Sequence, residues 1–284
     1  MDVDPEPIEA AAEEVLATLE IASGPVDPLE IARLEGIHLA PGDYGGCFDS
    51  RIEYRTRGGR GRFFVFYAEQ AGAWRPEGRV RFSIGHELGH FYLPEHREYV
   101  LTRKWHGSHT GFVSEERTER EADLFAAALL MPRPRFIDEV QLRCGGKCAM
   151  KDLERLASGV FQTSLTSTAI RYVHMNLEPC AVLVSANGRV RSAVISESMR
   201  ERGFTFIPRN SPVPSVSVTA RVCDTRPTAK GPQPSDVWFP ESRRSVPLWE
   251  EARRLGATKL VLTLLAVDDD GDDEEDDPEE DRDE

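Results

Sequence analysis

The spacing of apolar residues changes several times along the chain, and each change marks a predicted element. Residues 7–22 place apolar side chains three and four positions apart, which lines one face of an α-helix. A second, short helix is expected in residues 24–36, because Asp27 is a good amino-terminal cap and Gly36 can end a helix. Residues 37–70 contain short apolar and aromatic runs separated by glycine, which predict two or three strands.

Two longer helices are expected in the middle of the chain. The first covers about residues 79–93 and is ended by Pro94. The second covers about residues 114–131 and is closed by Pro132. Residues 95–112, between the two, contain several histidines and a tryptophan, and we interpret them as a loop.

The carboxy-terminal part of the chain has mostly strand patterns. Residues 181–196 predict a hairpin with Asn187 and Gly188 at its turn, because this pair accepts a positive φ at both positions. Proline and serine are frequent in residues 208–248, which predicts irregular loops and edge strands. Residues 248–267 predict a helix followed by a last strand.

Together these patterns predict an α+β protein. Residues 1–172 are expected to form helices with a small β-sheet, and residues 173–267 a mixed α/β accessory module of unknown role. Residues 268–284 hold 14 acids and one arginine and have almost nothing apolar to bury. We therefore expect this segment to be a disordered acidic tail.

The formal net charge is −14, and the tail alone carries −13 of it. The other residues therefore sum to about −1, which argues against the extended basic face of most tight nucleic-acid binders but leaves local patches open. The amino terminus has no charged-then-apolar leader, and no apolar run is as long as a membrane span. We expect a cytoplasmic protein with no membrane contact, and the sequence indicates no oligomeric state.

The five cysteines are expected to be free thiols, as is usual for a cytoplasmic chain. Cys144 and Cys148 are too far apart for the two-residue spacing of a zinc knuckle, and no second pair follows them. We therefore do not assign them to a metal site. The complete set is Cys47, Cys144, Cys148, Cys180 and Cys223.

Two histidines and a glutamate in the predicted helix at residues 79–93 are the main candidates for chemistry. His86 and His90 are four residues apart, so both imidazoles can reach one metal ion from the same helix face. Glu87 points about 100° round the helix from His86, which suits a general base better than a third equivalent ligand. The alternative is a pair of core histidines that are hydrogen-bonded to polar neighbours.

A catalytic zinc ion normally has three protein ligands, and the predicted helix at residues 114–131 supplies a candidate. Glu119 shares a face with Asp123, beside Ala122 and Ala126, and small residues let two helices approach closely. Glu119 is thus the expected third ligand, and Asp123 is expected to orient a ligand histidine through its far ring nitrogen. Three neighbouring acids are expected to be a solvated first helical turn, namely Glu115, Glu116 and Glu121.

These paired segments, "RVRFSIGHELGHFYL" and "EREADLFAAALLMP", resemble the ImmA/IrrE family of metallopeptidases. The opening "GPVDPLEIARLEGIHL" is also similar to that family, and the resemblance covers about residues 8–172. The sequence departs from the family at Gly85, where alanine is commoner, and at Asp123, where asparagine is commoner. The second departure changes the charge beside the candidate ligands.

The resemblance implies a zincin-like helical metallopeptidase core that binds one Zn²⁺ per chain. Carried over residue by residue, it makes His86, His90 and Glu119 the zinc ligands and Glu87 the catalytic acid and base. It also implies an endopeptidase whose substrate is a protein, in the family's known cases a helix-turn-helix repressor of stress or mobile-element genes. The possible partner of this chain is therefore such a repressor.

Other polar residues near these segments have weaker claims to a role. His106, His109, Tyr92 and Tyr99 could stabilise an oxyanion, but a surface or packing role is favoured for each. No partner is evident for three further histidines, His38, His96 and His174.

Residues 151–172 have the pattern of a helix-turn-helix, yet Lys151, Arg155 and Arg171 are sparse for a DNA reader. We interpret this segment as a packing unit of the first module. The competing hypothesis for the whole chain is a transcriptional regulator that binds DNA or protein and has a structural or vestigial metal site.

Overall fold

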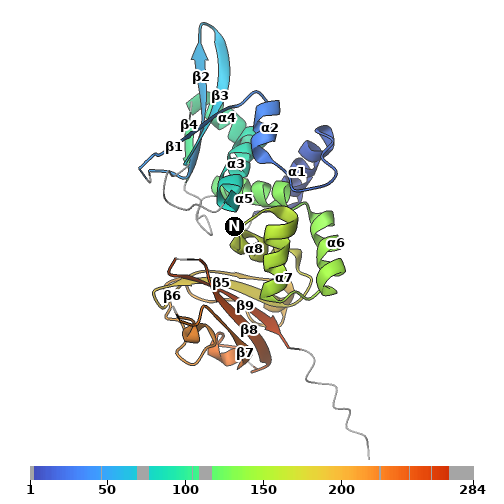
Figure 1. Cartoon of the computed structure of the whole chain (residues 1–284), viewed down its shortest axis with the longest axis vertical. Coiled ribbons are helices and arrows are strands. Elements are labelled where there is room, and N and C mark those ends of the chain that lie inside the picture. Colours follow the sequence, from blue (N-terminus) through green and yellow to red (C-terminus); the bar gives the residue numbers. More distant parts are fainter. Residues whose placement is uncertain are drawn as a thin grey trace, which may run out of the picture. The chain divides into compact units, whose positions relative to one another are not determined.

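The structure is a computed structural model of the 284-residue chain. The chain divides into two compact units, Met1–Met175 and Asn176–Glu284, each with its own sheet (Figure 1). The helices and the two sheets form an α+β fold, as the sequence predicted. The predicted disordered tail lies outside the described residues except for Asp268. The structure describes residues 3–45, 47–68, 77–103, 105–108, 117–223, 225–242, 244–256 and 258–268.

The first unit begins with the two predicted helices, α1 (Glu6–Thr18) and α2 (Pro28–Leu34). Asp27 caps α2 as predicted, because its carboxylate accepts a 3.0 Å hydrogen bond from the backbone N–H of Leu29. Buried apolar residues of both helices, among them Ala12 and Ile31, form part of the core of this unit.

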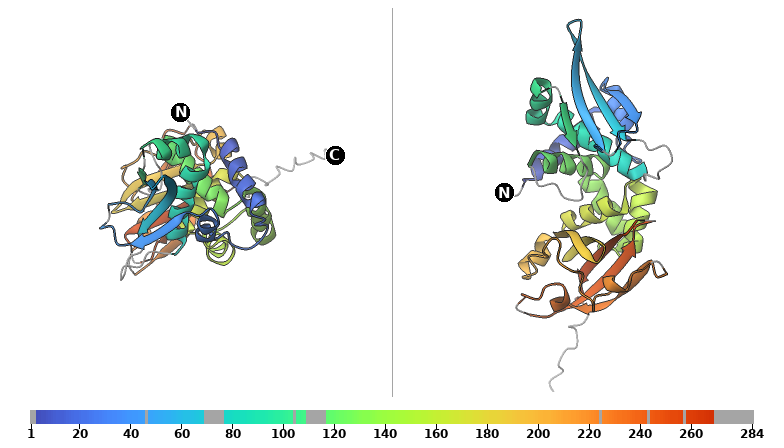
Figure 2. Two further views of the ribbon diagram at one scale, coloured as in Figure 1. Left: turned by 90° about the horizontal axis from the view of Figure 1, so that it is seen from above. Right: turned by 90° about the vertical axis from the view of Figure 1, so that its left-hand side faces the viewer.

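The sheet of the first unit has four strands in the order β1-β3-β2-β4. Strand β1 runs parallel to β3, and the other neighbours are antiparallel. Helix α3 packs against β2 and β3 (Figure 2), so the sheet covers one side of the helix with the candidate histidines. The strands are β1 (His38–Gly42), β2 (Ser50–Arg57), β3 (Arg60–Ala68) and β4 (Trp105–Ser108).

The predicted pair of middle helices is present as α3 (Glu77–Tyr92) and α5 (Arg117–Leu130). The prediction that residues 95–112 form a loop is wrong, because helix α4 (Pro94–Arg103) and strand β4 occupy most of this segment. Pro94 stands at the start of α4, where its missing N–H costs nothing, so it opens a new helix rather than only ending the previous one. Val100 anchors α4 because it is fully buried.

The first unit closes with α6 (Arg133–Cys144), α7 (Met150–Arg155), the π-helix Leu156–Phe161 and α8 (Leu165–Met175). Arg171 of α8 is 1% exposed and donates a 2.7 Å hydrogen bond to Glu9 of α1. Burial lowers the pKa of Arg171 and the paired Glu9 carboxylate raises it again, with a net lowering. This ion pair joins the first and last helices of the unit.

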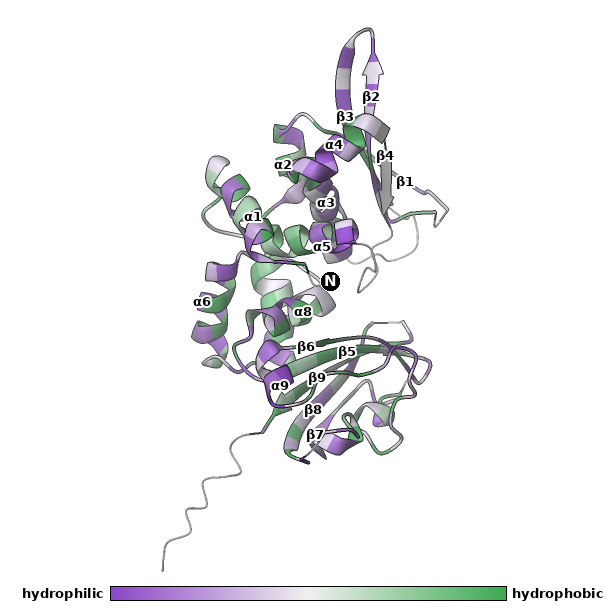
Figure 3. Ribbon diagram, turned by 180° about the vertical axis from the view of Figure 1, so that it is seen from behind, coloured by the Kyte–Doolittle hydropathy of each residue, from purple (hydrophilic) through white to green (hydrophobic). Residues whose placement is uncertain are grey.

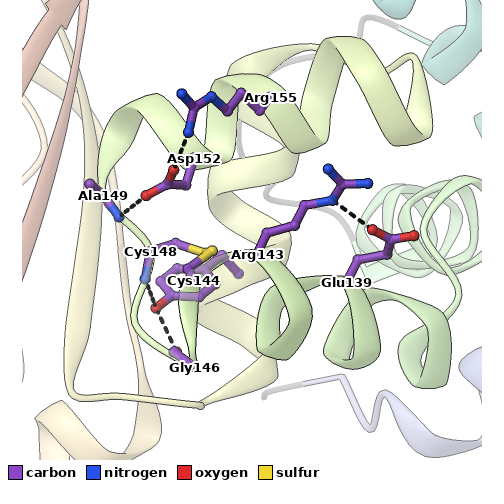
Figure 4. Close-up of a disulfide and its surroundings, with 9 residues drawn as sticks. Glu139, Arg143, Cys144, Gly146, Cys148, Ala149, Asp152 and Arg155 are labelled. Carbon is purple, nitrogen blue, oxygen red and sulfur yellow. Dashed lines mark hydrogen bonds and ion pairs between the residues drawn. A yellow bond between two sulfur atoms is a disulfide. The ribbon is translucent and has the colours of Figure 1, made fainter.

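Cys144 and Cys148 form a disulfide (Figure 4), so the prediction that they are free thiols is wrong. Gly145 and Gly146 both have positive φ, which folds the chain back and brings the two Cα atoms to 5.2 Å. The Tyr172 hydroxyl accepts from the N–H of Cys148 and donates to the carbonyl of Gly146. The two glycines were the sequence signal for this turn.

The second unit is built on a five-stranded antiparallel sheet in the order β6-β5-β9-β8-β7. The predicted hairpin is confirmed, with positive φ at Asn187 and Gly188. Strands β5 and β9 are largely hydrophobic (Figure 3), and a buried core that includes Phe204, Trp238 and Phe239 packs on the sheet. The elements are β5 (Cys180–Ala186), β6 (Arg189–Ile195), α9 (Glu197–Glu201), β7 (Thr228–Pro234), β8 (Pro247–Arg254) and β9 (Leu260–Val267).

The helix predicted at the start of residues 248–267 is wrong, because strand β8 occupies this position. Glu250 is the reason for the error: it is buried in the strand, where a polar residue is not expected. Its carboxylate accepts hydrogen bonds from the backbone N–H groups of Val218 and Thr219, at 3.1 and 2.7 Å. The inward alternation of Leu248, Glu250 and Ala252 is therefore strand-like, with a carboxylate in place of an apolar residue.

In the described part of the chain, every helix is too short or too polar to cross a bilayer.

Candidate metal centre

His86 and His90 lie one turn apart on α3 and are almost completely buried, at 1% and 2% exposed. Their Nε2 atoms are 3.1 Å apart. Glu119 of α5 faces both rings: its Oε2 lies 3.4 Å from Nε2 of His86 and its Oε1 lies 3.4 Å from Nε2 of His90. The structure therefore brings the three predicted ligands together.

Glycine and alanine residues allow α3 and α5 to approach this closely. A Cβ atom at Gly89 would lie 3.1 Å from the Cα atom of Ala122, and one at Gly85 would lie 3.4 Å from the Cβ atom of Ala126. Glycine inside a helix costs about 0.5–1 kcal/mol relative to alanine. The contact at Gly89 is tight enough to account for this cost and confirms the predicted role of a small residue there, whereas the contact at Gly85 is an ordinary one.

The three donor groups fit a zinc ion. Zinc–nitrogen and zinc–oxygen bonds of about 2.0–2.1 Å in a tetrahedron place neighbouring donors about 3.3 Å apart. The two Nε2 atoms are 3.1 Å apart, and one oxygen of Glu119 lies 3.4 Å from each of them, Oε2 from His86 and Oε1 from His90. With one donor atom per residue, the three donors lie within 4.8 Å of one another, which is close enough for a shared ion. Two imidazoles and one carboxylate are also a donor set of catalytic zinc sites, which leave a fourth position open.

Asp123 orients the first histidine, as predicted. Its Oδ1 lies 2.8 Å from Nδ1 of His86, which turns Nε2 of that ring toward Glu119. Burial lowers the pKa of His86, but hydrogen bonds and charge from Asp123 and Glu119 outweigh it and raise the pKa to about 10. Without a metal ion, His86 is therefore protonated at neutral pH.

His96 is the buried neighbour of the second histidine, a contact that the sequence did not indicate. Its Nδ1 lies 3.1 Å from Nδ1 of His90, and its Nε2 lies 2.9 Å from Oε2 of Glu121. The prediction that Glu121 belongs to a solvated turn is wrong, because its side chain is 13% exposed and pairs with His96 and Arg117. Burial raises the pKa of Glu121, but hydrogen bonds and charge from Arg117 and His96 lower it by more, so that the net shift of the pKa is downward.

Glu87 is fully buried on the sheet side of α3. The hydroxyl of Ser50, on β2, donates a 2.6 Å hydrogen bond to Oε1 of Glu87. Ser50 also approaches the carbonyl oxygen of Ser83, at 3.3 Å. No feature of the sequence pointed to Ser50, because the contact joins residues 37 positions apart.

The weaker candidates do not gather at this centre in the part of the chain that the structure describes. The Tyr92 hydroxyl donates to Glu35 at 2.8 Å, and burial followed by this contact raises its pKa. Tyr99 is 50% exposed on α4. The side chain of His106 and the whole of His109 lie outside the described residues, as do Glu115 and Glu116.

Residues 72–145 match the sequence model of the family described as the IrrE N-terminal-like domain. This range contains α3, α4 and α5, and hence every donor group of the centre. No curated protein matches the chain.

A solved structure, that of a Mycobacterium tuberculosis transcriptional regulator, resembles the chain with a TM-score of 0.58. It is 14% identical, and the similarity covers 92% of this chain and 76% of that one. At this identity the likeness concerns the fold alone.

Proposed function

The match over residues 72–145 supports an ImmA/IrrE assignment, and on this premise we propose that the chain is a zinc-dependent endopeptidase with one Zn²⁺ per chain. His86, His90 and Glu119 hold the ion, and Glu87 is the catalytic acid and base. The core is zincin-like, and the enzyme acts on a protein in the cytoplasm.

The convergence of the three donor groups carries this proposal, because the two Nε2 atoms are 3.1 Å apart and each has an oxygen of Glu119 at 3.4 Å, close to the spacing that zinc requires. Zinc supplies Lewis acidity, which lowers the pKa of water and polarises a carbonyl group. Glu87 follows His86 on α3 and points to an adjacent sector of the helix, and in this proposal it takes a proton from the attacking water and passes it to the leaving amine. Ser50 holds one oxygen of that carboxylate in position.

The substrate that fits best is a helix-turn-helix repressor. Known members of the family that this chain resembles cleave such proteins. The resemblance to a transcriptional regulator adds a weaker link to gene regulation. The second unit, which largely coincides with the accessory module that we predicted at residues 173–267, would then contribute to sensing or to substrate docking.

The competing hypothesis is a DNA- or protein-binding regulator with a structural metal site. Burial in α8 argues against DNA binding by the helix pair at residues 151–172. Arg171 is buried against Glu9, and Thr168, Ala169 and Tyr172 are also fully buried. Arg155 is exposed but pairs with Asp152. This burial supports our interpretation of the helix pair as a packing unit.

The test is cleavage of candidate repressors by the full chain and by Glu87→Gln, with both proteins loaded with zinc. We expect the wild type to produce fragments that mass spectrometry can identify, and Glu87→Gln to bind stoichiometric zinc without cleaving. Glu98→Gln, on an exposed position of α4, is the matched control and should cleave normally. Equal cleavage by Glu87→Gln would overturn the catalytic role.

A structural metal site predicts a different outcome. Chelation would then unfold the first unit, because the metal would supply folding free energy. We expect instead that the chelated protein stays folded, since the α3–α5 contact is apolar and closely packed around Gly89 and Ala122.

A further inference from the structure

His96 lies on the side of His90 that is opposite the donor cluster. It belongs to α4, whereas His90 belongs to α3, and it is 4% exposed. The two rings are 5.0 Å apart between centroids, with 3.1 Å between their Nδ1 atoms. A buried histidine needs partners for both ring nitrogens, and here one of those partners is a candidate metal ligand.

The direction of each hydrogen bond follows from the donor cluster. His90 presents Nε2 to His86 and Glu119, so a metal ion would take the lone pair of that nitrogen. The ring then carries its proton on Nδ1, which must donate to Nδ1 of His96. His96 therefore accepts at Nδ1 and carries its own proton on Nε2.

The next hydrogen bond runs from His96 to Glu121, in the same donor-to-acceptor direction. Nε2 of His96 donates to Oε2 of Glu121 at 2.9 Å. Oε1 of Glu121 in turn accepts from Nε of Arg117 at 2.7 Å. Every ring nitrogen in this series thus has a partner of the right kind, and the series ends on a carboxylate that an arginine holds in place.

We propose that His96 is a positioning residue for His90: it fixes the tautomer and the ring orientation in which His90 binds the metal ion, and Glu121 fixes His96 in turn. The inference rests on the proposed metal site and deepens it. The two ligand histidines are then supported differently. His86 has a carboxylate in direct contact, at 2.8 Å from Asp123, whereas His90 reaches its carboxylate through a neutral imidazole.

This difference predicts that the two ligand histidines differ in basicity. A direct carboxylate partner increases the basicity of His86 more than a neutral imidazole increases that of His90. Helix α4 also becomes part of the metal site, because His96 contacts the His90 ring at Nδ1.

The first test uses zinc affinity, measured by competition with a chromophoric chelator. Loss of a group that orients a metal ligand weakens metal binding by about 10–100-fold, and we expect this for His96→Phe, which keeps a planar ring but has no acceptor. His96→Gln can accept from His90 and donate to Glu121, so we expect it to restore most of the affinity. His38→Phe makes the same substitution at an exposed histidine of β1 and should bind zinc like the wild type.

Two outcomes of this test would count against the positioning role. Unchanged zinc affinity in His96→Phe overturns it. Loss of one of two bound ions in His96→Phe also overturns it, because His96 would then be a ligand of its own site. Failure of the wild type to bind zinc would overturn the proposed function together with this inference. That outcome is distinguishable from the two above, in which the wild type binds zinc and only the role of His96 fails.

The second test reads the hydrogen bond directly, and its first measurement needs no variant. In the zinc-loaded wild type, ¹⁵N chemical shifts should show His96 protonated at Nε2 and unprotonated at Nδ1. A proton on Nδ1 of His96 would overturn the proposal even if His96→Phe failed to fold. In the cobalt-substituted protein, His96→Gln should shift the NMR resonance of the exchangeable ring proton of His90 and leave that of His86 unchanged. Asp123→Asn should shift the resonance of His86 and leave that of His90 unchanged.

Discussion

The hydroxyl of Ser50 donates a 2.6 Å hydrogen bond to the Glu87 carboxylate, and both residues are fully buried. A hydrogen bond to a charged group contributes about 1.5–3 kcal/mol, so this contact is a strong restraint on the proposed catalytic base. It comes from the sheet and not from the helix that carries the histidines.

We predict that Ser50→Ala lowers kcat by about 10–100-fold, which corresponds to that free energy, and leaves zinc stoichiometry unchanged. Ser83→Ala is the matched control: Ser83 is also buried, and its hydroxyl has no hydrogen-bond partner among the described residues. Steady-state kinetics on a cleaved substrate would check both. A Ser50→Ala enzyme as active as Ser83→Ala would contradict the prediction.

The two helix glycines are predicted to respond in opposite ways to alanine. Gly89→Ala places a Cβ 3.1 Å from the Cα atom of Ala122, where backbone must move, so α5 is pushed away and Glu119 with it. We expect a loss of about 1–3 kcal/mol of stability and weaker zinc binding. Urea unfolding and chelator competition would measure these effects.

Gly85→Ala is the control for this substitution. Its Cβ would meet the Cβ atom of Ala126 at 3.4 Å, an ordinary contact. We expect a gain of up to about 1 kcal/mol from helix propensity and unchanged zinc affinity. If Gly85→Ala and Gly89→Ala lost the same amount of stability and zinc affinity, the close approach would not be specific to Gly89.

The protonation of His86 predicts how the metal-free protein responds to pH. Burial lowers the pKa of His86, and the carboxylates of Asp123 and Glu119 raise it to about 10, from 6.5 in an unfolded chain. Because the pKa of His86 is higher in the folded state, the protonated ring stabilises that state. This contribution to the unfolding free energy is complete below about pH 6.5 and is lost as the pH rises through about 10.

Chelator-treated protein should therefore lose unfolding free energy between about pH 6.5 and 10, and Asp123→Asn should flatten that slope. Zinc must displace the same proton, so zinc affinity should increase over this range. Urea unfolding and chelator competition at several pH values would test both trends. A pH-independent affinity would contradict a protonated His86 in the metal-free state.

The disulfide between Cys144 and Cys148 is predicted to stabilise the protein modestly. It closes a loop with a sequence separation of 4, and chain entropy gives about 2 kcal/mol for so small a ring. Cys144→Ser/Cys148→Ser should lower the unfolding free energy by no more than this, and the reductant dithiothreitol should then have no further effect. Cys47→Ser, at an exposed free cysteine, is the control.

Disulfides are rare in the cytosol, where those that form are mostly transient or redox-sensing. The redox state of Cys144 and Cys148 in cells therefore bears on the proposed cytoplasmic location. Alkylation of cell extracts before and after reduction would measure it. A permanently oxidised pair would favour an oxidising compartment instead.

The thiols of Cys180 and Cys223 are predicted to react at different rates. A hydrogen bond from Thr225 and backbone contacts lower the pKa of the exposed Cys223. Burial raises the pKa of Cys180, and the nearby Glu178 raises it further. Iodoacetamide at neutral pH should modify Cys223 in the folded protein and leave Cys180 intact, as peptide mass spectrometry would show. Modification of Cys180 in the folded protein would contradict its burial.

Periodicity explains which parts of the site could be predicted. His86, His90 and Glu119 lie on regular helices whose faces follow from the 3.6-residue repeat, and Asp123 is one turn beyond Glu119. The hairpin at Asn187 was predictable because a local turn requires positive φ there.

Long-range contacts explain what could not be predicted. Ser50 and His96 reach the site from β2 and α4, and their sequence positions carry no periodic signal for it. Glu250 was misjudged for a related reason, since its partners Val218 and Thr219 lie about 30 residues away, at separations of 32 and 31. In each case a polar side chain is buried only because a distant segment satisfies it.

The ion pair between Glu9 and Arg171 has a consequence for biosynthesis. Its partners are 162 residues apart, so at about 5–20 residues per second Glu9 is synthesised roughly 8–30 s before Arg171. All the metal donors are translated in that interval. Helix α1 can therefore form its ion pair with α8 only after both donor helices have been synthesised. A ribosome stalled just before residue 171 would carry a nascent chain that has every proposed zinc ligand but not the Glu9–Arg171 ion pair.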